Sequence, residues 1–300
     1  MAWLYIGLIA YFLNAVSFVI SKVILTDILP DAWTYTFYVN ALGIFVVLLI
    51  PFGFAVPAFP VIAAAIASGI TYVFALLILY KLLAKDEASQ VVPLTGGLTP
   101  VFVFLMAFLF LSEVLSTSQI IGFVLIVIGG FVAAHEGPVK GKLRYSEAKL
   151  LWGSVISALL FGASQVLLKF VFDQIPFLNG FIWRGFGAVA GAAILLAFAE
   201  PRRRIFASFK QSTVKTETAF VAAQGAALAS FVMVNYAISI GPVSLVNALS
   251  GVQYAFLFGI IVFLSRRLPK LLKEPLNPNV VKQKIWSILL ITAGVFALFI

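Results

Sequence analysis

One arginine stands inside a long apolar stretch of the sequence. Arg184 lies about seven residues into the hydrophobic segment 177–199. An arginine at such a depth in a membrane costs about 2.5–3.5 kcal/mol, and it is usually kept where it faces a cavity or the interior of a helix bundle. Its guanidinium can hold a carboxylate or a phosphate through two parallel hydrogen bonds. No acidic residue lies at a comparable depth, so we expect Arg184 to bind an anionic or zwitterionic solute. The alternative is a side chain that reaches back to the near membrane surface.

The apolar segment 89–111 is interrupted by two prolines with a glycine pair between them. Proline cannot donate a backbone hydrogen bond, and in lipid the freed carbonyls persist only where protein or water covers them. We therefore expect either a broken or hinged helix that acts as a gate at a binding site, or a kink that serves packing alone. The expected hinge residues are Pro93, Gly96, Gly97 and Pro100, and the hydroxyl groups beside them are those of Thr95 and Thr99.

Other polar side chains are scattered through the apolar segments. Each is more often an interhelical hydrogen bond than a ligand contact. Together they recur in eight of the ten apolar segments, whereas 118–135 and 284–300 nearly lack them. This distribution is typical of a central cavity with two outer support helices. The candidate substrate-binding residues, besides Arg184 and the two threonines, are Asn14, Tyr38, Asn40, Tyr72, Gln165, Trp183, Gln224, Asn247 and Gln253.

Several kinds of chemistry are excluded by residues that the sequence lacks. It has no cysteine and one histidine, His135, so thiolate or multi-histidine metal sites and a cysteine nucleophile are ruled out. Every Asp and Glu falls at or beyond the end of an apolar segment, which disfavours a membrane-embedded proton carrier. We expect no cofactor, no metal and no enzymatic activity. Facilitated diffusion or exchange is favoured over proton-coupled export.

The composition defines the elements that must position these residues. Of the 300 residues, 63% are hydrophobic and 10% are charged, whereas soluble domains have about 25% charged residues. The chain must therefore be solvated by lipid. A membrane-spanning helix needs about 20 apolar residues, and the sequence predicts ten such helices: 3–25, 32–54, 60–83, 89–111, 118–135, 149–171, 177–199, 217–239, 243–264 and 284–300. The longer polar stretches between them, such as 200–216, are expected to be connectors.

The positive charges lie on one side of this arrangement. Nine loops connect the ten predicted helices. Of the 20 Lys and Arg residues, 18 fall in or beside the first, third, fifth, seventh and ninth of these loops. Basic loops usually remain in the cytoplasm, so both termini are predicted to lie on the outer side of the membrane. We expect this membrane to be the cytoplasmic membrane of the cell. The net charge of +9 then reflects topology and contact with lipid, and no nucleic-acid partner is needed to explain it.

The two halves of the sequence resemble each other. Four motifs recur in the same order, among them 88–97 with 242–251, and 126–131 with 291–296. We predict a first five-helix repeat over 1–136, a connecting loop over 137–148 and a second repeat over 149–300. Because five is odd, the second repeat enters the membrane from the opposite side. Such inverted repeats are common in secondary transporters, which bind substrate near the midplane and alternate access between the two faces.

The sequence also resembles a known family, the EamA-type proteins of the drug/metabolite transporter superfamily. The resemblance is carried by 87–102, which reads EASQVVPLTGGLTPVF, by Ser112-Glu113-Val114-Leu115 and by Gly122 with Gly129-Gly130. It implies an all-α fold of ten helices around a central cavity and export or exchange of small metabolites. Members of the family more usually keep both termini in the cytoplasm, opposite to what the loop charges predict here.

Small metabolites, with amino acids foremost, are therefore the expected substrates, and we expect the protein to function as a monomer in the lipid bilayer. A flippase for lipid-linked sugars is the second transport hypothesis, because the family includes such proteins. A membrane scaffold subunit that transports nothing is a third hypothesis, and it would have no water-filled cavity.

Overall fold

A computed structural model describes residues 1–24, 31–84, 88–134, 147–209, 214–265 and 278–300. Within these ranges the chain is helical and contains no strand. The elements are α1 (Ala2–Ile24), α2 (Ala32–Ala41), the 3₁₀ helix η1 (Leu42–Phe52), α3 (Phe59–Leu83), α4 (Ala88–Leu111), α5 (Thr117–Ala134), α6 (Glu147–Gln174), α7 (Phe177–Ala197), α8 (Ala199–Phe209), α9 (Val214–Ile240), α10 (Val243–Ala248), α11 (Ser250–Ser265) and α12 (Pro278–Ala297).

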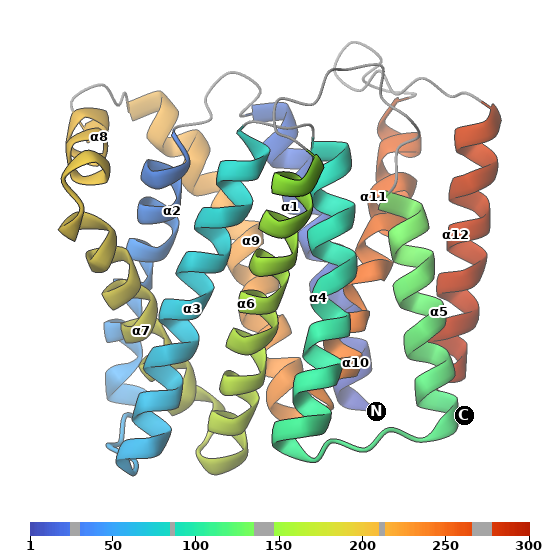
Figure 1. Cartoon of the computed structure of the whole chain (residues 1–300), viewed down its shortest axis with the longest axis horizontal. Helices are drawn as coiled ribbons and strands as arrows, with labels where there is room; N and C mark the ends of the chain where they lie inside the picture. The colour runs from blue at the N-terminus through green and yellow to red at the C-terminus, as the bar shows by residue number, and fades with distance from the viewer. Residues whose placement is uncertain (25–30, 85–87, 135–146, 210–213, 266–277) are drawn as a thin grey trace.

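The long helices stand side by side and run between two ends of the molecule (Figure 1). The N-terminus and the C-terminus lie at the same end, at the bottom of the view, which we call the terminal end. The described connections at that end are short: 53–58 joins η1 to α3, 112–116 joins α4 to α5, 175–176 joins α6 to α7, and 241–242 joins α9 to α10. The chain therefore turns tightly at the terminal end.

The helices are long and apolar enough for a membrane protein. Six helical stretches in the described residues can cross a bilayer by length and composition, and three shorter apolar helices accompany them. Large apolar side chains point outward, such as Phe110 (75% exposed) and Trp286 (66% exposed). An exposed apolar surface of this extent requires lipid around it. The protein is therefore an integral membrane protein.

Several expectations from the sequence differ from the structure. The segment 32–54, expected to be one helix, consists of α2 followed by the 3₁₀ helix η1, which begins at Leu42. The segment 243–264, expected to be one helix, consists of α10 and α11 with a turn at Leu249. The backbone N–H of Val252 donates to the carbonyl of Leu249 (2.9 Å), which tightens the chain locally. By contrast, α4 is one continuous α-helix through Gly96, Gly97 and Pro100, so the broken helix expected there is not seen.

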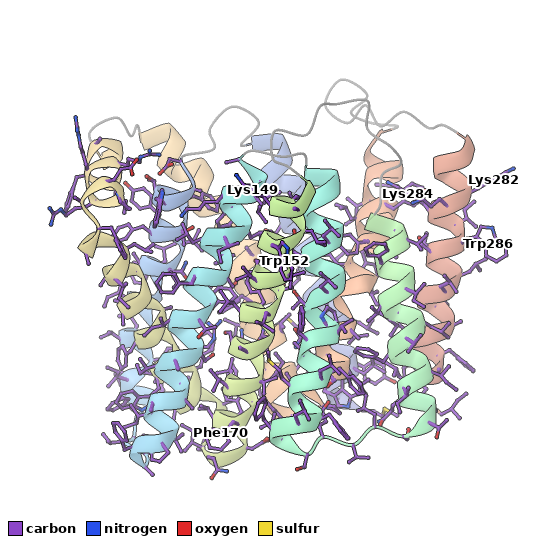
Figure 2. All side chains as sticks on the ribbon, viewed as in Figure 1. Lys149, Trp152, Phe170, Lys282, Lys284 and Trp286 are labelled. Atoms are coloured by element: carbon purple, nitrogen blue, oxygen red, sulfur yellow. The ribbon has the colours of Figure 1, made fainter. Side chains whose placement is uncertain are left out.

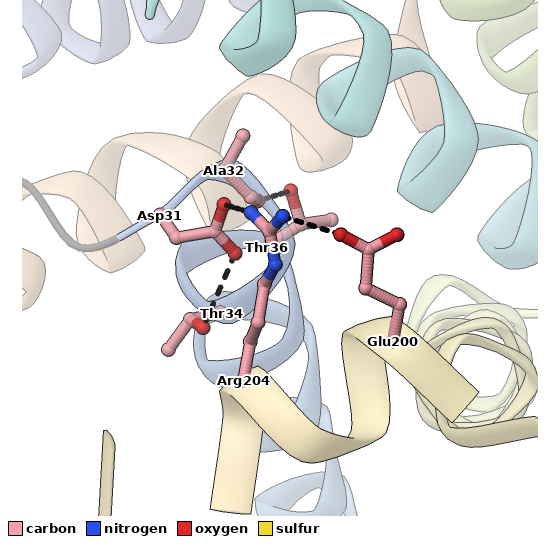
Figure 3. Close-up of polar contacts among 6 residues, drawn as sticks. All are labelled: Asp31, Ala32, Thr34, Thr36, Glu200 and Arg204. Atoms are coloured by element: carbon pink, nitrogen blue, oxygen red, sulfur yellow. Dashed lines mark hydrogen bonds and ion pairs between the residues drawn. The ribbon is translucent and has the colours of Figure 1, made fainter. Parts of the chain in front are cut away.

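Helix α8 is a further difference, because its residues were expected to form a connector. Arg204 of α8 makes ion pairs with Asp31 (2.9 Å) at the start of α2 and with Glu200 (2.5 Å) one turn away (Figure 3). The hydrogen bonds to Glu200 and Asp31 raise the pKa of the Arg204 guanidinium above its ordinary value. Charged residues that the sequence suggested for a loop thus stabilise a short helix.

Candidate functional site

Glycines bring α7 into close contact with its neighbours. A Cβ atom on Gly187 would meet the backbone carbonyl oxygen of Ile66 on α3, and one on Gly69 of α3 would meet the backbone of α7 at Arg184 and Ala188. On another side, a Cβ on Gly185 would lie 2.6 Å from the side chain of Val46 on η1. Gly69, Gly185 and Gly187 therefore serve helix packing within the chain. This packing fixes the position of the Arg184 backbone.

The Arg184 guanidinium lies against two neighbouring aromatic rings, whose centroids are 5.7 Å apart. Its Cζ atom is 4.7 Å from the ring centroid of Tyr72 on α3 and 4.6 Å from that of Phe231 on α9. The residue is 3% exposed, so the side chain does not reach the near surface. Cations are attracted to the faces of aromatic rings, more strongly when water is excluded. The faces of the two rings therefore stabilise the buried guanidinium.

One edge of this guanidinium has no protein partner. The Nε and Nη2 atoms of Arg184 are buried and make no hydrogen bond within the described residues. None of the ion pairs found in that part of the chain involves Arg184. Nε and Nη2 lie on the same edge, where their two N–H bonds can be bridged by the two oxygens of one carboxylate. The site thus presents a complete but unused donor pair for an anion.

More aromatic and polar side chains surround this pair of rings. The ring of Phe161 on α6 lies 5.5 Å from that of Tyr72, and the ring of Phe181 lies 6.1 Å from that of Phe231. Gln165 lies one turn from Phe161 on α6. Its buried Oε1 accepts no hydrogen bond within the described residues. The Nδ2 of Asn235 donates to the carbonyl of Phe231 (2.6 Å), and its Oδ1 accepts nothing there. Unpaired acceptors therefore accompany the unpaired donors.

Tyr72, Gln165 and Arg184 were candidates from the sequence, whereas Phe161 and Phe231 were missed. Phenylalanine is abundant, with 30 in the chain, and these residues are most simply explained by lipid contact or packing. The signal that could have found Phe231 is its spacing of four residues from Asn235, which places both on the same side of α9.

Other candidates lie away from Arg184 or make local bonds. The Nδ2 atoms of Asn40 and Asn247 donate to the carbonyls of Thr36 (2.8 Å) and Val243 (2.9 Å), four residues earlier in each case. The indole of Trp183 donates to the carbonyl of Ala55 (3.0 Å). Trp183 therefore helps to hold the connection after η1 and does not join the Arg184 cluster.

The α4 candidates form a separate group that faces α5 and α11. The Thr99 hydroxyl donates to the carbonyl of Thr95 (2.7 Å), and the Thr95 hydroxyl has no partner among the described residues. A Cβ on Gly96 would lie 2.6 Å from the hydroxyl of Tyr254, and one on Gly97 would lie 2.8 Å from the ring of Phe131. The glycine pair thus makes room for two aromatic side chains in the continuous helix.

The remaining candidates have fewer contacts. Asn14 and Gln253 are half-buried on α1 and α11, and Tyr38 packs beside Phe37 with ring centroids 5.9 Å apart. The side chains of Pro93 and Gln224 are outside the described residues. In the part of the chain that the structure describes, no three His, Cys, Asp or Glu side chains gather as metal ligands would.

These features define a polytopic helical membrane protein with a buried, unpaired cation among aromatic rings. Residues 1–134 match the model of the EamA-like transporter family. These residues, which make up less than half of the chain, are similar to that family of membrane transporters.

Two further comparisons found similar proteins. The chain is 42% identical over 69 residues to an uncharacterised protein of Methanocaldococcus jannaschii, a match over 23% of this chain and 50% of the relative. It thus spans about half the length of that curated relative. A crystal structure of another protein covers 99% of this chain and 95% of its own with a TM-score of 0.66 and 16% identity. That similarity shows a shared fold.

Proposed function

We propose that the protein is a secondary transporter of small anionic or zwitterionic solutes, with amino acids as the foremost class. The observation that carries this proposal is the unpaired Nε and Nη2 edge of Arg184, whose guanidinium lies against the rings of Tyr72 and Phe231. A buried donor without a partner costs about 1–3 kcal/mol. A carboxylate bridging the two nitrogens would remove this cost and form charge-assisted hydrogen bonds. Solute binding is thus favoured at this position.

Alternating access between two inverted five-helix repeats is the mechanism that we propose. Support comes from the packing of α5 on α12, whose residues 126–131 and 291–296 correspond to each other in the proposed repeats. A Cβ on Gly129 would lie 2.7 Å from Cγ1 of Ile291, and a Cβ on Gly294 would lie 2.7 Å from Cγ1 of Ile126. Reciprocal contacts of this kind are expected where a two-fold axis relates two elements.

A second pair of contacts supports the same symmetry. Helix α3 packs along α6, and the proposed counterparts of these helices, α9 and α1, also pack along each other. Serine hydroxyls bond across both pairs: Ser68 donates to the carbonyl of Ser164 (2.8 Å), and Ser230 donates to that of Ala10 (2.8 Å). If the halves are equivalent, each can adopt the conformation of the other, which is the basis of a carrier that opens to either face.

A thermal-shift screen of the purified protein tests the binding function. We expect solutes with a carboxylate, such as amino acids, to raise the melting temperature of the wild type, because a ligand that binds only the folded state stabilises it. Arg184→Met keeps much of the side-chain length and removes both donors. It should abolish the shift. An equal shift in the variant would exclude Arg184 from the binding site.

A further inference from the structure

A hollow opens at the terminal end of the molecule. It has a volume of about 380 Å³ and lies among the ends of α4 and α6 and the turn between α9 and α10. Its walls include Glu113, Lys169, Asp173 and Ser239. Sites for small molecules usually measure about 300–1,000 Å³, so the hollow is large enough for a small metabolite. It carries both signs of charge.

The charged groups of the hollow differ in how firmly they are held. Both carboxylate oxygens of Glu113 accept backbone N–H groups at the start of α10, from Val243 (2.9 Å) and Ser244 (3.2 Å). Lys169 pairs with Asp173 (2.8 Å) one turn away on α6, and the Asp173 side chain is 45% exposed whereas that of Lys169 is 15% exposed. An ion pair with an exposed member contributes little to stability. Lys169 can therefore exchange Asp173 for another anion.

One side of α6 connects this hollow with the Arg184 site. Asp173, Lys169, Gln165 and Phe161 follow each other at intervals of four residues, which places each next to the following one on the helix surface. Phe161 contacts Tyr72, which lies on the face of Arg184. The stripe from Asp173 to Phe161 covers about 18 Å at a rise of about 1.5 Å per residue. Figure 2 labels Phe170, the neighbour of Lys169, at the terminal end of α6.

We propose that the hollow is the vestibule through which solutes pass between the terminal end and Arg184, with Lys169 as a second anion-binding group. The solute carboxylate replaces Asp173 on Lys169 and then moves along α6 to the free edge of Arg184. Gln165 follows Lys169 and precedes Phe161 in this stripe of α6, and its unpaired Oε1 accepts a hydrogen bond from the ammonium group of a zwitterionic solute. This proposal rests on the proposed binding function of Arg184 and adds the route to it.

The absence of cysteine from the sequence permits a direct test with single-cysteine variants. Gln165→Cys should react with the anionic reagent sulfonatoethyl methanethiosulfonate applied from the terminal end. Replacing Lys169 as well, in Gln165→Cys with Lys169→Gln, should lower this rate about tenfold, because a cation one turn away attracts the reagent. The rate with the cationic trimethylammonium analogue should not fall.

Three controls define the side and the specificity of the reaction. Ala2→Cys, at the exposed N-terminus, identifies the membrane preparation in which the terminal end faces the reagent. Lys149→Gln, at the opposite end of α6 in Figure 2, should leave the rate at position 165 unchanged. Ile156→Cys, an exposed apolar position on the same helix, should stay unreactive in lipid.

A Gln165→Cys variant that fails to react when Ala2→Cys reacts would overturn the proposed route. An anionic rate that is unaffected by Lys169→Gln would remove Lys169 from it. Neither result depends on a known solute, so both are separate from the thermal-shift test of Arg184. If carboxylates stabilise the protein through Arg184 and the route experiment fails, the binding function stands and the route is wrong.

Discussion

Removal of the Arg184 charge should stabilise the protein in the absence of solute. Its Nε and Nη2 atoms are buried without partners, and each unpaired donor costs about 1–3 kcal/mol. The contacts with Tyr72 and Phe231 return about 1–2 kcal/mol each. Methionine keeps favourable contacts with aromatic rings, worth about 0.3–1.5 kcal/mol. We therefore expect Arg184→Met to raise the free energy of unfolding by about 1–2 kcal/mol.

Thermal unfolding in detergent, in a buffer free of carboxylates, measures this change. A gain of 1 kcal/mol corresponds to about 2–4 °C in melting temperature for a large domain. Ser68→Ala is the matched control, because the Ser68 hydroxyl donates to the carbonyl of Ser164 (2.8 Å) and has a structural role. We expect it to lower stability by about 0.6–1.7 kcal/mol.

The two variants should therefore shift in opposite directions. A binding residue that the fold does not need destabilises the protein until its ligand arrives. If Arg184 were instead part of a satisfied buried network, its removal would cost about 3–5 kcal/mol. A fall of more than about 2 kcal/mol in Arg184→Met would contradict our interpretation of the unpaired edge.

Three further predictions concern packing, capping and orientation. Gly187→Leu should lower the free energy of unfolding by more than about 3 kcal/mol, because the leucine side chain would collide with the α3 backbone. In the same assay, Gly259→Ala is the control. Nothing lies within 4 Å of its new Cβ, so it should raise the free energy of unfolding by up to about 1 kcal/mol. Glu113→Ala should cost about 1–3 kcal/mol by removing the acceptor of two N–H groups of α10, and an unchanged melting temperature would contradict this. Arg203→Cys should resist impermeant thiol reagents in intact cells if the termini lie outside, whereas rapid labelling would reverse that orientation.

The positions of the long helices could be predicted from the lengths of the apolar segments, which are read directly from the sequence. Helix α3 was expected over 60–83 and is found over Phe59–Leu83. Breaks and short helices were harder to predict, because tertiary contacts decide them. The turn at Leu249 precedes Gly251, which approaches Gly130 of α5 so closely that a Cβ on Gly130 would lie 2.6 Å from the Gly251 Cα. The prolines in α4 were a stronger sequence indication of a helix break than any residue near Leu249, yet α4 is continuous.

The site could be predicted in part from the cost of burial. Arg184 was identified as a candidate because a charged side chain within a membrane-spanning segment is energetically costly and is usually kept for a function. The roles of Phe161 and Phe231 depend on which faces of α6 and α9 turn inward, and apolar residues on all sides of a membrane helix do not indicate its inner face. Lys169 near the end of α6 lines the hollow at the terminal end. The surrounding helices, and not its own segment, determine its environment.

Solute exchange in proteoliposomes would show whether Arg184 is needed for transport. The labelled carboxylate solute that gives the largest thermal shift would be followed as it exchanges against the same solute inside the vesicles. We predict exchange by the wild type and background rates for Arg184→Met, although that variant remains folded and at least as stable. Exchange by Arg184→Met at the wild-type rate would contradict this role of Arg184, because the solute would then cross the membrane without the guanidinium that lies against Tyr72 and Phe231.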